Sequence, residues 1–295
     1  MSRTNILVID GNWYAHRAFY TIDIERPEPE KALAYRFLSM ICKDAIETRA
    51  KHLLVAFDGP KVFRYKLYPE YKSSRTSKDK ATGKKIEPGE QSDDPLARMM
   101  PYLLEYLTEA GIPWVRPKKF EGDDVLAAIA HYFKDDEDYL VYLGIQDKDL
   151  YQSLAKNVRL FMSNTKPEPT RFTWKDAEKA KGVKIKQMID YQTVLGDSID
   201  DIPGIPGYGP VTVAAKLREH GSLKKWMKAA KGDERKKLLI HRDQLELNAK
   251  LVTMRTDSYE PDLAMMTVPK KKPVHLPRSH AAYVDWLYPK TKGLF

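Results

Sequence analysis

Two short apolar runs, each closed by Asp-Gly, constrain the fold of this 295-residue chain more than any other feature. Residues 6–9 are followed by Asp10 and a glycine, and residues 53–57 are followed by Asp58 and a glycine. Unbroken apolar runs are typical of strands that are buried on both faces of a parallel sheet. Residues 32–49 carry apolar side chains at helical spacing, which predicts a strand–helix–strand unit with a right-handed crossover.

The alternation of strands and helices continues along the chain. Residues 139–145 and 158–162 are expected to form further strands, residues 112–115 a short strand, and residues 95–111 a helix ended by a glycine. The sequence therefore predicts an α/β protein with a mostly parallel sheet flanked by helices. From residue 174 the chain is helical and lysine-rich, with two helices expected over 221–232 and 234–254.

Acidic residues follow the ends of the predicted strands. The carboxyl ends of parallel strands share one edge of a sheet, so these side chains should meet in one cleft. Each Asp-Gly pair would also fit an ordinary turn, and acids that open a helix would also fit capping. Clustered carboxylates repel one another unless a cation lies between them. The candidate ligands are Asp10, Asp58, Glu121, Asp123, Asp124, Asp147, Asp149, Asp197 and Asp200.

The chemistry of this set indicates hard cations. The histidines are scattered and Cys42 is the single cysteine, which excludes a cysteine zinc site, and an all-oxygen set favours Mg²⁺ or Mn²⁺. Such ions polarise a phosphoryl oxygen and generate hydroxide from bound water, and a pair about 4 Å apart stabilises both reacting oxygens. The residues alone therefore predict metal-dependent phosphodiester hydrolysis.

A basic and aromatic segment predicts a nucleic-acid partner. The net charge is +9, and residues 61–85 interleave Phe63, Tyr65, Tyr68 and Tyr71 with many cations. Cations for phosphates and rings for unstacked bases suit a single-stranded nucleic acid. A solvated linker remains the alternative, because residues 73–92 are almost without apolar side chains. The cations are Lys61, Arg64, Lys66, Lys72, Arg75, Lys78, Lys80, Lys84 and Lys85.

A glycine-rich turn follows the last acidic cluster. Residues 195–213 read L-G-D-S-I-D-D-I-P-G-I-P-G-Y-G-P-V-T-V. Gly204, Gly207 and Gly209 can take positive φ and admit a close neighbour, and backbone N–H groups at the start of the following helix suit a phosphate. The first residues lead straight into a strand, with no signal peptide or membrane span, which predicts a soluble cytoplasmic protein.

The ordered motifs from about residue 6 to 257 resemble the 5′-nuclease (flap endonuclease) family, which includes phage 5′-exonucleases and the nuclease domain of bacterial DNA polymerase I. They are V-I-D-G, A-F-D-G, Y-P-E-Y-K-S-S-R, E-G-D-D, D-K-D, G-D-S-I-D-D-I-P-G-I-P-G-Y-G-P and K-L-V-T-M-R-T-D. Any one of them is weak, whereas the ordered set is specific. The tail after about residue 269 lies outside the resemblance.

The resemblance implies a Rossmann-like (PIN-like) sheet, a helical arch that passes the 5′ single strand, and a helix–three-turn–helix motif that grips duplex DNA. We expect a nuclease core over residues 1–175 with the arch at about 61–110, a helical region over 176–269, and a basic tail over 270–295. Two Mg²⁺ or Mn²⁺ ions are implied at the cleft, and K⁺ at the helix–three-turn–helix.

The implied activity is Mg²⁺-dependent 5′-3′ exonuclease and flap endonuclease cleavage of DNA or RNA–DNA hybrids in replication or repair, by a monomer in a bacterial cell or phage-infected host. The family's ligands to one ion correspond to Asp58, Glu121, Asp123 and Asp124, with Asp10 nearby. Its ligands to the other ion correspond to Asp147, Asp149, Asp197 and Asp200. Lys72, Arg75 and Arg17 match substrate-contacting cations, and Tyr71 matches a base-stacking ring. The DNA-binding positions are Gly204, Gly207, Gly209, Thr212 and Lys216.

Three departures from the family pattern bear on the site. Gly122 stands where alanine is usual, Val211 where lysine is frequent, and Asp201 where asparagine is frequent, which leaves the role of Asp201 open. A DNA-structure-binding protein without catalysis and a ribonuclease without an arch remain alternatives. The retained acids count against the first, and the basic segment and glycine turn count against the second. An aspartyl phosphatase would need a second aspartate after the first strand, where Asn12 stands.

Overall fold

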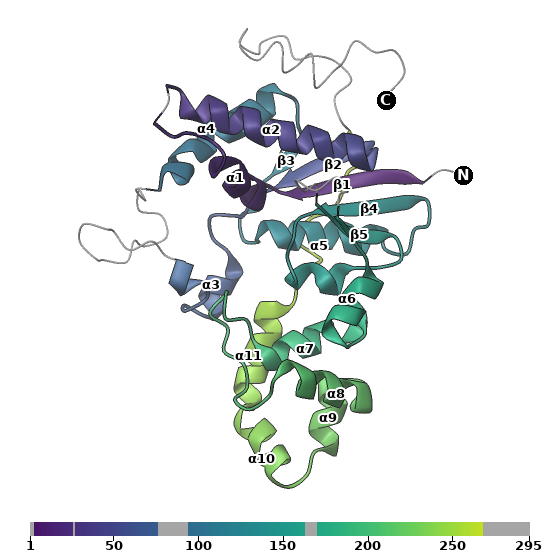
Figure 1. Ribbon diagram of the computed structural model, residues 1–295. Coiled ribbons are helices and arrows are strands. Elements are labelled where there is room, and N and C mark those ends of the chain that lie inside the picture. The colour runs from purple at the N-terminus through teal and green to yellow at the C-terminus, as the bar shows by residue number, and fades with distance from the viewer. Residues whose placement is uncertain (1–2, 26, 76–93, 163–169, 268–295) are drawn as a thin grey trace, which may run out of the picture.

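The computed structural model describes residues 3–25, 27–75, 94–162 and 170–267. Its centre is a six-stranded sheet in the order β3-β2-β1-β4-β5-β6 (Figure 1). Neighbouring strands are parallel except for β6, which runs antiparallel to β5. The predicted α/β class with a mostly parallel sheet is confirmed. The strands are β1 (Thr4–Asp10), β2 (His52–Ala56), β3 (Trp114–Val115), β4 (Tyr139–Gly144), β5 (Val158–Met162) and β6 (Thr170–Phe172).

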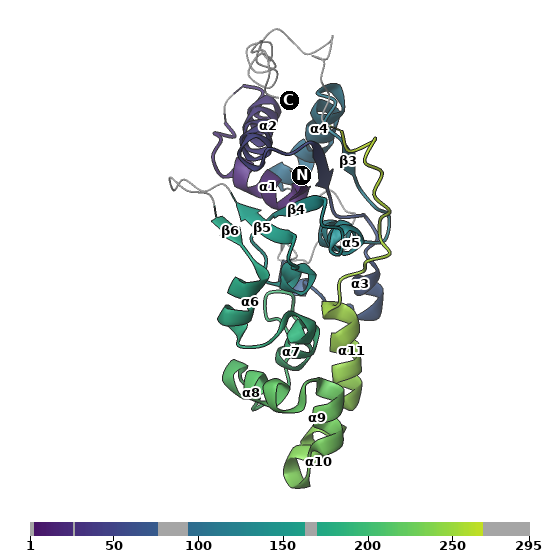
Figure 2. The ribbon, with the colours of Figure 1, turned by 90° about the vertical axis from the view of Figure 1, so that its right-hand side faces the viewer.

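Helices cover both faces of the sheet (Figures 1 and 2). One face carries α1 (Gly11–Phe19), α2 (Pro29–Thr48) and α4 (Pro95–Glu109), and the other carries α5 (Gly122–Phe133). Leu7 and Ile9 of β1 pack with the first group of helices, whereas Ile6 and Val8 pack with α5. Because both faces are buried, the strand has no polar alternation.

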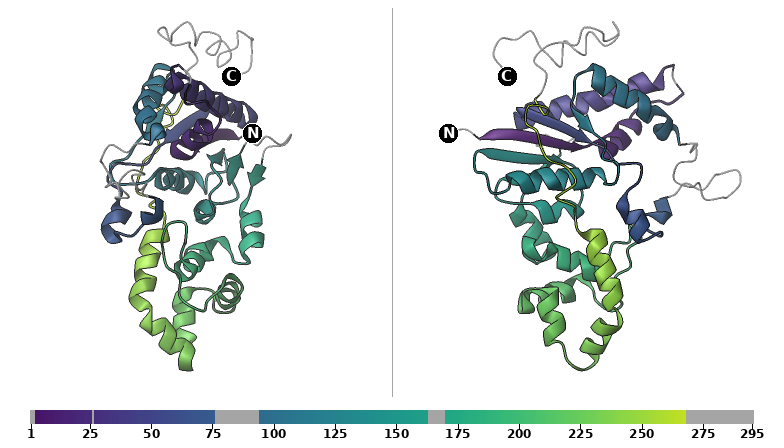
Figure 3. Two further views of the ribbon diagram at one scale, coloured as in Figure 1. Left: turned by 60° about the vertical axis from the view of Figure 1, so that its left-hand side comes forward. Right: turned by 180° about the vertical axis from the view of Figure 1, so that it is seen from behind.

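A helical region extends from the sheet (Figure 2). The core is continuous across the junction, because Val213, Leu217 and Trp226 belong to the same buried cluster as the apolar side chains of α5. Helix α11 packs against α7, and the chain then returns along the α/β part, where Leu53 N–H donates to the Met266 carbonyl at 2.7 Å (Figure 3). The helices are α6 (Trp174–Lys181), α7 (Met188–Leu195), α8 (Pro210–His220), α9 (Leu223–Ala229), α10 (Gly232–Ile240) and α11 (Arg242–Val252).

Short elements complete the chain, and several differ from the predictions. Helix α3 (Phe63–Leu67), the 3-10 turns Ser73–Arg75, Asp149–Ser153 and Ile185–Gln187, and strand β6 were not expected. The single helix predicted over 234–254 is wrong, because the chain breaks at His241 and α11 turns back onto α7. Hydrophobic spacing does not reveal such a break, since α10 buries Leu238 alone and has almost no apolar periodicity to interrupt.

Two predicted features lie outside the described residues. They are the middle of the arch with its lysines (residues 76–93) and the basic tail (residues 270–295). Within the described ranges, no helix is both long enough and apolar enough to cross a bilayer.

Candidate active site

Seven carboxylate side chains line one cavity of about 250 Å³ at the carboxyl ends of the central strands. Strand β1 ends in Asp10, β2 leads into Asp58, and β4 leads into the turn that holds Asp147. The sheet order places β1 between β2 and β4, so these strand ends are neighbours. The seven are Asp10, Asp58, Glu121, Asp123, Asp147, Asp149 and Asp200. The structure thus brings together most of the predicted ligands, apart from Asp124 and Asp197.

Backbone contacts fix the acids of β1 and β2. Asp10 caps α1 by accepting the Trp13 N–H at 3.0 Å. Asp58 accepts the N–H of Gly122, the first residue of α5, at 2.7 Å. A side chain at Gly122 would place its Cβ 3.1 Å from the Ala56 carbonyl oxygen, so the glycine lets α5 approach closely.

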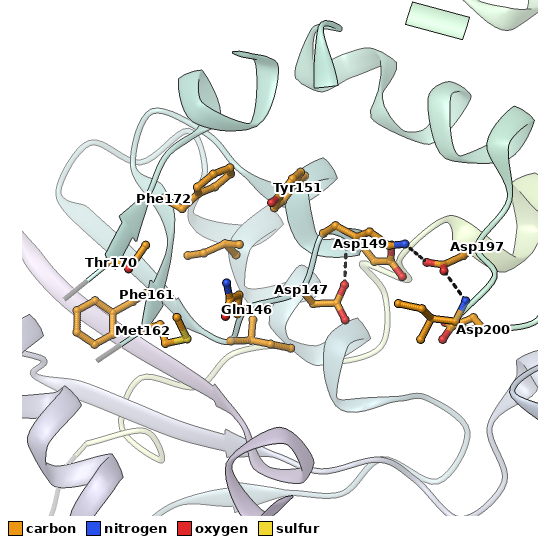
Figure 4. Close-up of a pocket in the computed structure, with 14 residues that line it drawn as sticks. Gln146, Asp147, Asp149, Tyr151, Phe161, Met162, Thr170, Phe172, Asp197 and Asp200 are labelled. Carbon is orange, nitrogen blue, oxygen red and sulfur yellow. Dashed lines mark hydrogen bonds and ion pairs between the residues drawn. The ribbon is translucent and has the colours of Figure 1, made fainter. Parts of the chain in front are cut away.

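The acids after β4 and α7 form a second group beside a neighbouring pocket of about 360 Å³. Figure 4 shows Asp147, Asp149, Asp197 and Asp200 along one side of this pocket. Asp147 accepts the Asp149 N–H at 2.8 Å, which closes the tight turn that the two-residue spacing predicts. Lys148 pairs with Asp197 at 2.9 Å and leaves its side chain 40% exposed.

Tyr71 and Lys72 contact one acid of each group, Glu121 of the first group (Asp10, Asp58, Glu121 and Asp123) and Asp200 of the second. The Tyr71 hydroxyl donates to Glu121 at 3.0 Å and to Asp200 at 3.1 Å. The Lys72 ammonium contacts Glu121 at 2.5 Å and lies 3.8 Å from Asp200. Since Tyr71 is only 3% exposed, its ring has no free face on which a base could stack, and the base-stacking prediction does not fit this geometry.

Asp124 lies outside the cavity, in a buried ion pair. Arg64 donates to both carboxylate oxygens of Asp124 at 2.7 Å. One of these oxygens, Oδ1, also accepts the backbone N–H of Arg255 at 2.9 Å. Asp124 is fully buried and Arg64 is 1% exposed. The prediction that Asp124 holds a metal ion does not fit these contacts, and neither does the placement of Arg64 in an exposed basic surface.

Arg17 does not line the cavity, and the placement of the Arg75 side chain is not described. The Arg17 guanidinium stacks over the Trp13 ring at 4.5 Å from its centroid, and Trp13 itself lines the cavity. Arg75 ends the turn Ser73–Arg75, and its side chain lies outside the described part of the chain. Asp201, whose role the sequence left open, accepts the Ser74 N–H at 2.7 Å, so it anchors that turn.

The three glycines predicted to bind DNA differ in whether the fold requires a glycine at their position. Gly207 has a φ of 77°, whereas Gly204 is required by a close approach, because a Cβ there would lie 2.2 Å from the Leu195 carbonyl oxygen. Gly209 needs neither property. Thr212 is exposed, but Lys216 pairs with Glu234 at 2.9 Å.

Burial and mutual repulsion favour the protonated form of several cleft acids. Burial raises the pKa of Asp10 to about 7, and the charge of Asp58 adds to this effect. Burial, followed by the charge of Asp147, raises the pKa of Asp149 to about 8. Burial and the charge of Asp10 also raise the pKa of Asp123 well above its ordinary value. The charge of Lys72 opposes the shift at Asp123 and that of Lys148 opposes the shift at Asp149, but burial and repulsion outweigh both.

Glu121 is the exception in the cleft. Burial alone would raise its pKa, but the charges of Lys72 and Arg64 hold that pKa below its ordinary value. Two protein cations therefore keep this carboxylate ionised.

The donor set fits a metal ion chemically. One oxygen of Asp123 is buried and accepts no hydrogen bond from the described residues. A divalent cation would satisfy that oxygen and offset the repulsion that raises the neighbouring pKa values. In the described conformation, no three Asp, Glu, His or Cys side chains converge closely enough to enclose one ion. A Mg²⁺ ion held by one or two of these carboxylates would complete its coordination with water.

Sequence reasoning missed the residues that hold the acids in place. The sequence pattern places Arg64 with its basic neighbours, and no motif marks Gln152 or Gln192, although Gln192 donates to Asp149 at 2.5 Å. A neutral glutamine carries no signal in one sequence, because its partners are distant in the chain.

Comparisons with known proteins match both parts of the chain. A model described as 5′-3′ exonuclease, N-terminal resolvase-like domain, matches residues 5–183, and one described as 5′-3′ exonuclease, C-terminal SAM fold, matches residues 183–273. The 5′-3′ exonuclease of Aquifex aeolicus is 32% identical over 85% of this chain and 82% of its own. DNA polymerase I of Bacillus caldotenax is 28% identical over 87% of this chain, which spans 28% of that polymerase.

Solved structures share the fold. The T5 D15 protein co-crystallised with metal ions has a TM-score of 0.67 and 23% identity over 85% of this chain and 90% of its own. The catalytic core of Rad2 in complex with DNA substrate has a TM-score of 0.57 and 15% identity over 97% and 92%. These two likenesses support the PIN-like fold alone. By the matches of both family models and the Aquifex relative, the chain belongs to the 5′-3′ exonuclease family and is a nuclease.

Proposed function

We propose that this protein is a Mg²⁺-dependent, structure-specific nuclease that cuts DNA at 5′ ends and 5′ single-stranded flaps by two-metal-ion catalysis. The observation that carries the proposal is the convergence of seven carboxylates on one cavity, with an unpartnered oxygen on Asp123. Such an all-oxygen set of ligands is suited to hard cations.

The carboxylates divide into two ligand groups. Asp10, Asp58, Glu121 and Asp123 would hold one ion, and Asp147, Asp149, Asp197 and Asp200 would hold the other. When bound, the ions supply polarisation of the phosphoryl oxygen and a bound water of lowered pKa. In this proposal Asp124 is an anchor for the first group rather than a ligand, because Arg64 engages both of its oxygens.

Lys72 supplies a positive charge at the point where the substrate phosphate would enter. Its ammonium lies between Glu121 and Asp200 at the edge of the cavity. An ammonium in that position can donate to a phosphate oxygen and so orient the scissile bond. Tyr71 has a different task from the predicted one, since its hydroxyl orients the carboxylates of Glu121 and Asp200.

The start of α8 is the proposed grip on duplex DNA. The N-terminal N–H groups of this helix and the exposed Thr212 are suited to a backbone phosphate. DNA is the substrate in the Rad2 structure and is present in a T5 D15 complex, which supports DNA as the partner here. A K⁺ ion at the glycine turn, activity on RNA–DNA hybrids, a monomeric state and a role in replication or repair stay predictions.

Product sizing on labelled substrates tests the proposal. We expect a 5′-labelled flap to be cut in Mg²⁺ and to remain intact in EDTA, with short products from a nicked duplex. RNA–DNA hybrids in the same assay determine whether primers are also substrates. Cleavage of the flap that persists in EDTA would overturn the metal mechanism. If single strands without a duplex were cut as fast as flaps, the proposed structure specificity would be overturned.

A further inference from the structure

The end of α11 lies between the two carboxylate groups. This segment carries the motif K-L-V-T-M-R-T-D, to which no role has been assigned so far. In Figure 2, α11 runs from the helical region toward α3 and α5. The last carbonyl groups of a helix have no partners within the helix and must find others. Here Arg64 and Gln152 supply them from opposite sides.

Arg64 connects this helix end to the first group. Its guanidinium donates to the Leu251 carbonyl at 2.9 Å and the Thr253 carbonyl at 3.3 Å. It also donates to Glu121 at 2.8 Å and twice to Asp124. These are five hydrogen bonds, as many as a guanidinium has N–H groups. The positive charge also opposes the negative end of the helix dipole.

Gln152 makes the matching connection to the second group. Its amide nitrogen donates to the Val252 carbonyl at 2.9 Å and to the Asp149 carbonyl at 3.0 Å. Its amide oxygen accepts the Met254 N–H at 3.0 Å. One glutamine therefore ties the backbone of a second-group acid to the backbone at the end of α11.

We propose that Leu251–Met254, held by Arg64 and Gln152, forms a clasp that sets the spacing between the two ligand groups. Arg64 and Gln152 are then positioning residues for the metal-dependent reaction. This inference rests on the proposed function, because spacing matters only if both groups hold ions. Two ions that act together on one phosphate need a separation of about 4 Å. The clasp also joins the cleft to the helical region, so the cutting site keeps a fixed distance from the proposed duplex grip.

The decisive variant is Gln152→Leu, which keeps the side-chain bulk and removes these three hydrogen bonds together with a longer one, 3.4 Å, to the Gln192 amide oxygen. Residues that hydrogen-bond to the ligands of a metal ion typically contribute 10- to 100-fold to metal affinity or activity. We expect kcat on a 5′-flap substrate to fall about tenfold or more, with KM for DNA within about twofold. We also expect Mn²⁺ affinity, measured without DNA by electron paramagnetic resonance of the free ion, to fall by about tenfold.

Gln244→Leu is the matched control. Gln244 lies on α11 and donates to the Pro203 carbonyl at 2.8 Å, and neither of these two residues lines the cavity. Both variants lose a side-chain hydrogen bond to the backbone, so a purely structural effect would lower the melting temperature in each without lowering Mn²⁺ affinity. The clasp is overturned if the kcat and Mn²⁺ affinity of Gln152→Leu match those of Gln244→Leu.

Arg64→Lys provides a second test, because it keeps the charge and removes the planar fork that reaches the carbonyls and carboxylates together. We expect the same loss of Mn²⁺ affinity in this variant, and unchanged affinity in a folded Arg64→Lys would count against the clasp.

Wild-type protein in the same assays separates the two proposals. If it neither cuts flaps nor binds Mn²⁺, the proposed function fails and the clasp with it. If it does both and Gln152→Leu does so equally well, the clasp alone fails.

Discussion

The two carboxylate groups of the cleft differ in how their charge is compensated. In the first group, Lys72 and Arg64 contact Glu121 directly, and both cations are nearly buried. In the second group, Lys148 pairs with Asp197 and is well exposed, and Lys72 lies 3.8 Å from Asp200. Burial raises the pKa of Asp149 to about 8, whereas that of Glu121 is lowered by its cations although burial opposes this.

This difference indicates a division of labour. Within the first group the protein itself stabilises the ionised form of Glu121, and the ion pair of Arg64 and Asp124 is part of that framework. The cations of the second group are either more distant or more exposed, so its ionised form depends more on an added cation. The following predictions test this contrast, beginning with the largest expected effect.

Removing the second group should abolish cleavage. For Asp147→Ala/Asp149→Ala we expect cleavage to fall by a factor on the order of 10³ or more, because loss of an ion's charge stabilisation removes several kcal/mol. Affinity for a flap substrate, measured by fluorescence anisotropy in Ca²⁺, should stay nearly unchanged. The double variant Asp135→Ala/Glu137→Ala removes two exposed acids elsewhere and controls for net charge. Retained cleavage would remove the second group from the mechanism.

Removing the cation of the first group should have the next largest effect. For Lys72→Met we expect kcat to fall about 10²- to 10³-fold, which is typical when a donor that stabilises transition-state charge is lost. Single-turnover kinetics on the flap substrate would measure this loss. Lys118→Met, at an exposed lysine, serves as the control. A variant with the wild-type rate would show that Lys72 only balances the charge of Glu121.

The raised pKa values predict that the metal-free protein loses stability as pH rises. Asp10 holds its proton more strongly when folded, so its contribution is full below its ordinary pKa of 3.8 and declines as pH increases through about 7. For Asp10 alone the loss between pH 5 and pH 8 is on the order of 2–3 kcal/mol. Glu121 has the opposite sign, because its lowered pKa stabilises the fold above its ordinary value of 4.5.

Urea unfolding in EDTA at pH 5 and pH 8 measures this dependence. The variant Asp10→Asn should flatten the decline, and Mg²⁺ should restore stability more at pH 8 than at pH 5, since it binds the ionised acids. An equally steep decline in Asp10→Asn would assign the pH dependence to other groups.

Removing Lys148, the exposed cation of the second group, should have the smallest effect on kcat. For Lys148→Met we expect kcat to change by less than about fivefold, because exposed ion pairs contribute about 0–1 kcal/mol. Comparison with Lys72→Met under identical conditions is the measurement. A loss as large as that of Lys72→Met would mean that Lys148 contacts the substrate, and the contrast between the two groups would then need another basis.

Sequence patterns predicted the fold and the edge of the sheet at which the acids meet. The runs before Asp10 and Asp58 specify buried parallel strands, and such strands bring their carboxyl ends together. The patterns failed where the outcome depends on long-range contacts. Tyr71 and Arg64 have the composition of a nucleic-acid surface, yet both are buried against acids that are distant in the chain.

The sequence by itself determined the class of protein, because backbone periodicity and the order of acidic motifs are local properties of the chain. Only the tertiary structure decided which acids face the cavity and which are tied into the framework. Asp123 and Asp124 are adjacent in the sequence, but helical geometry turns one toward the cleft and the other toward Arg64. That choice depends on the end of α11, about 130 residues further along the chain, whose position local patterns cannot predict.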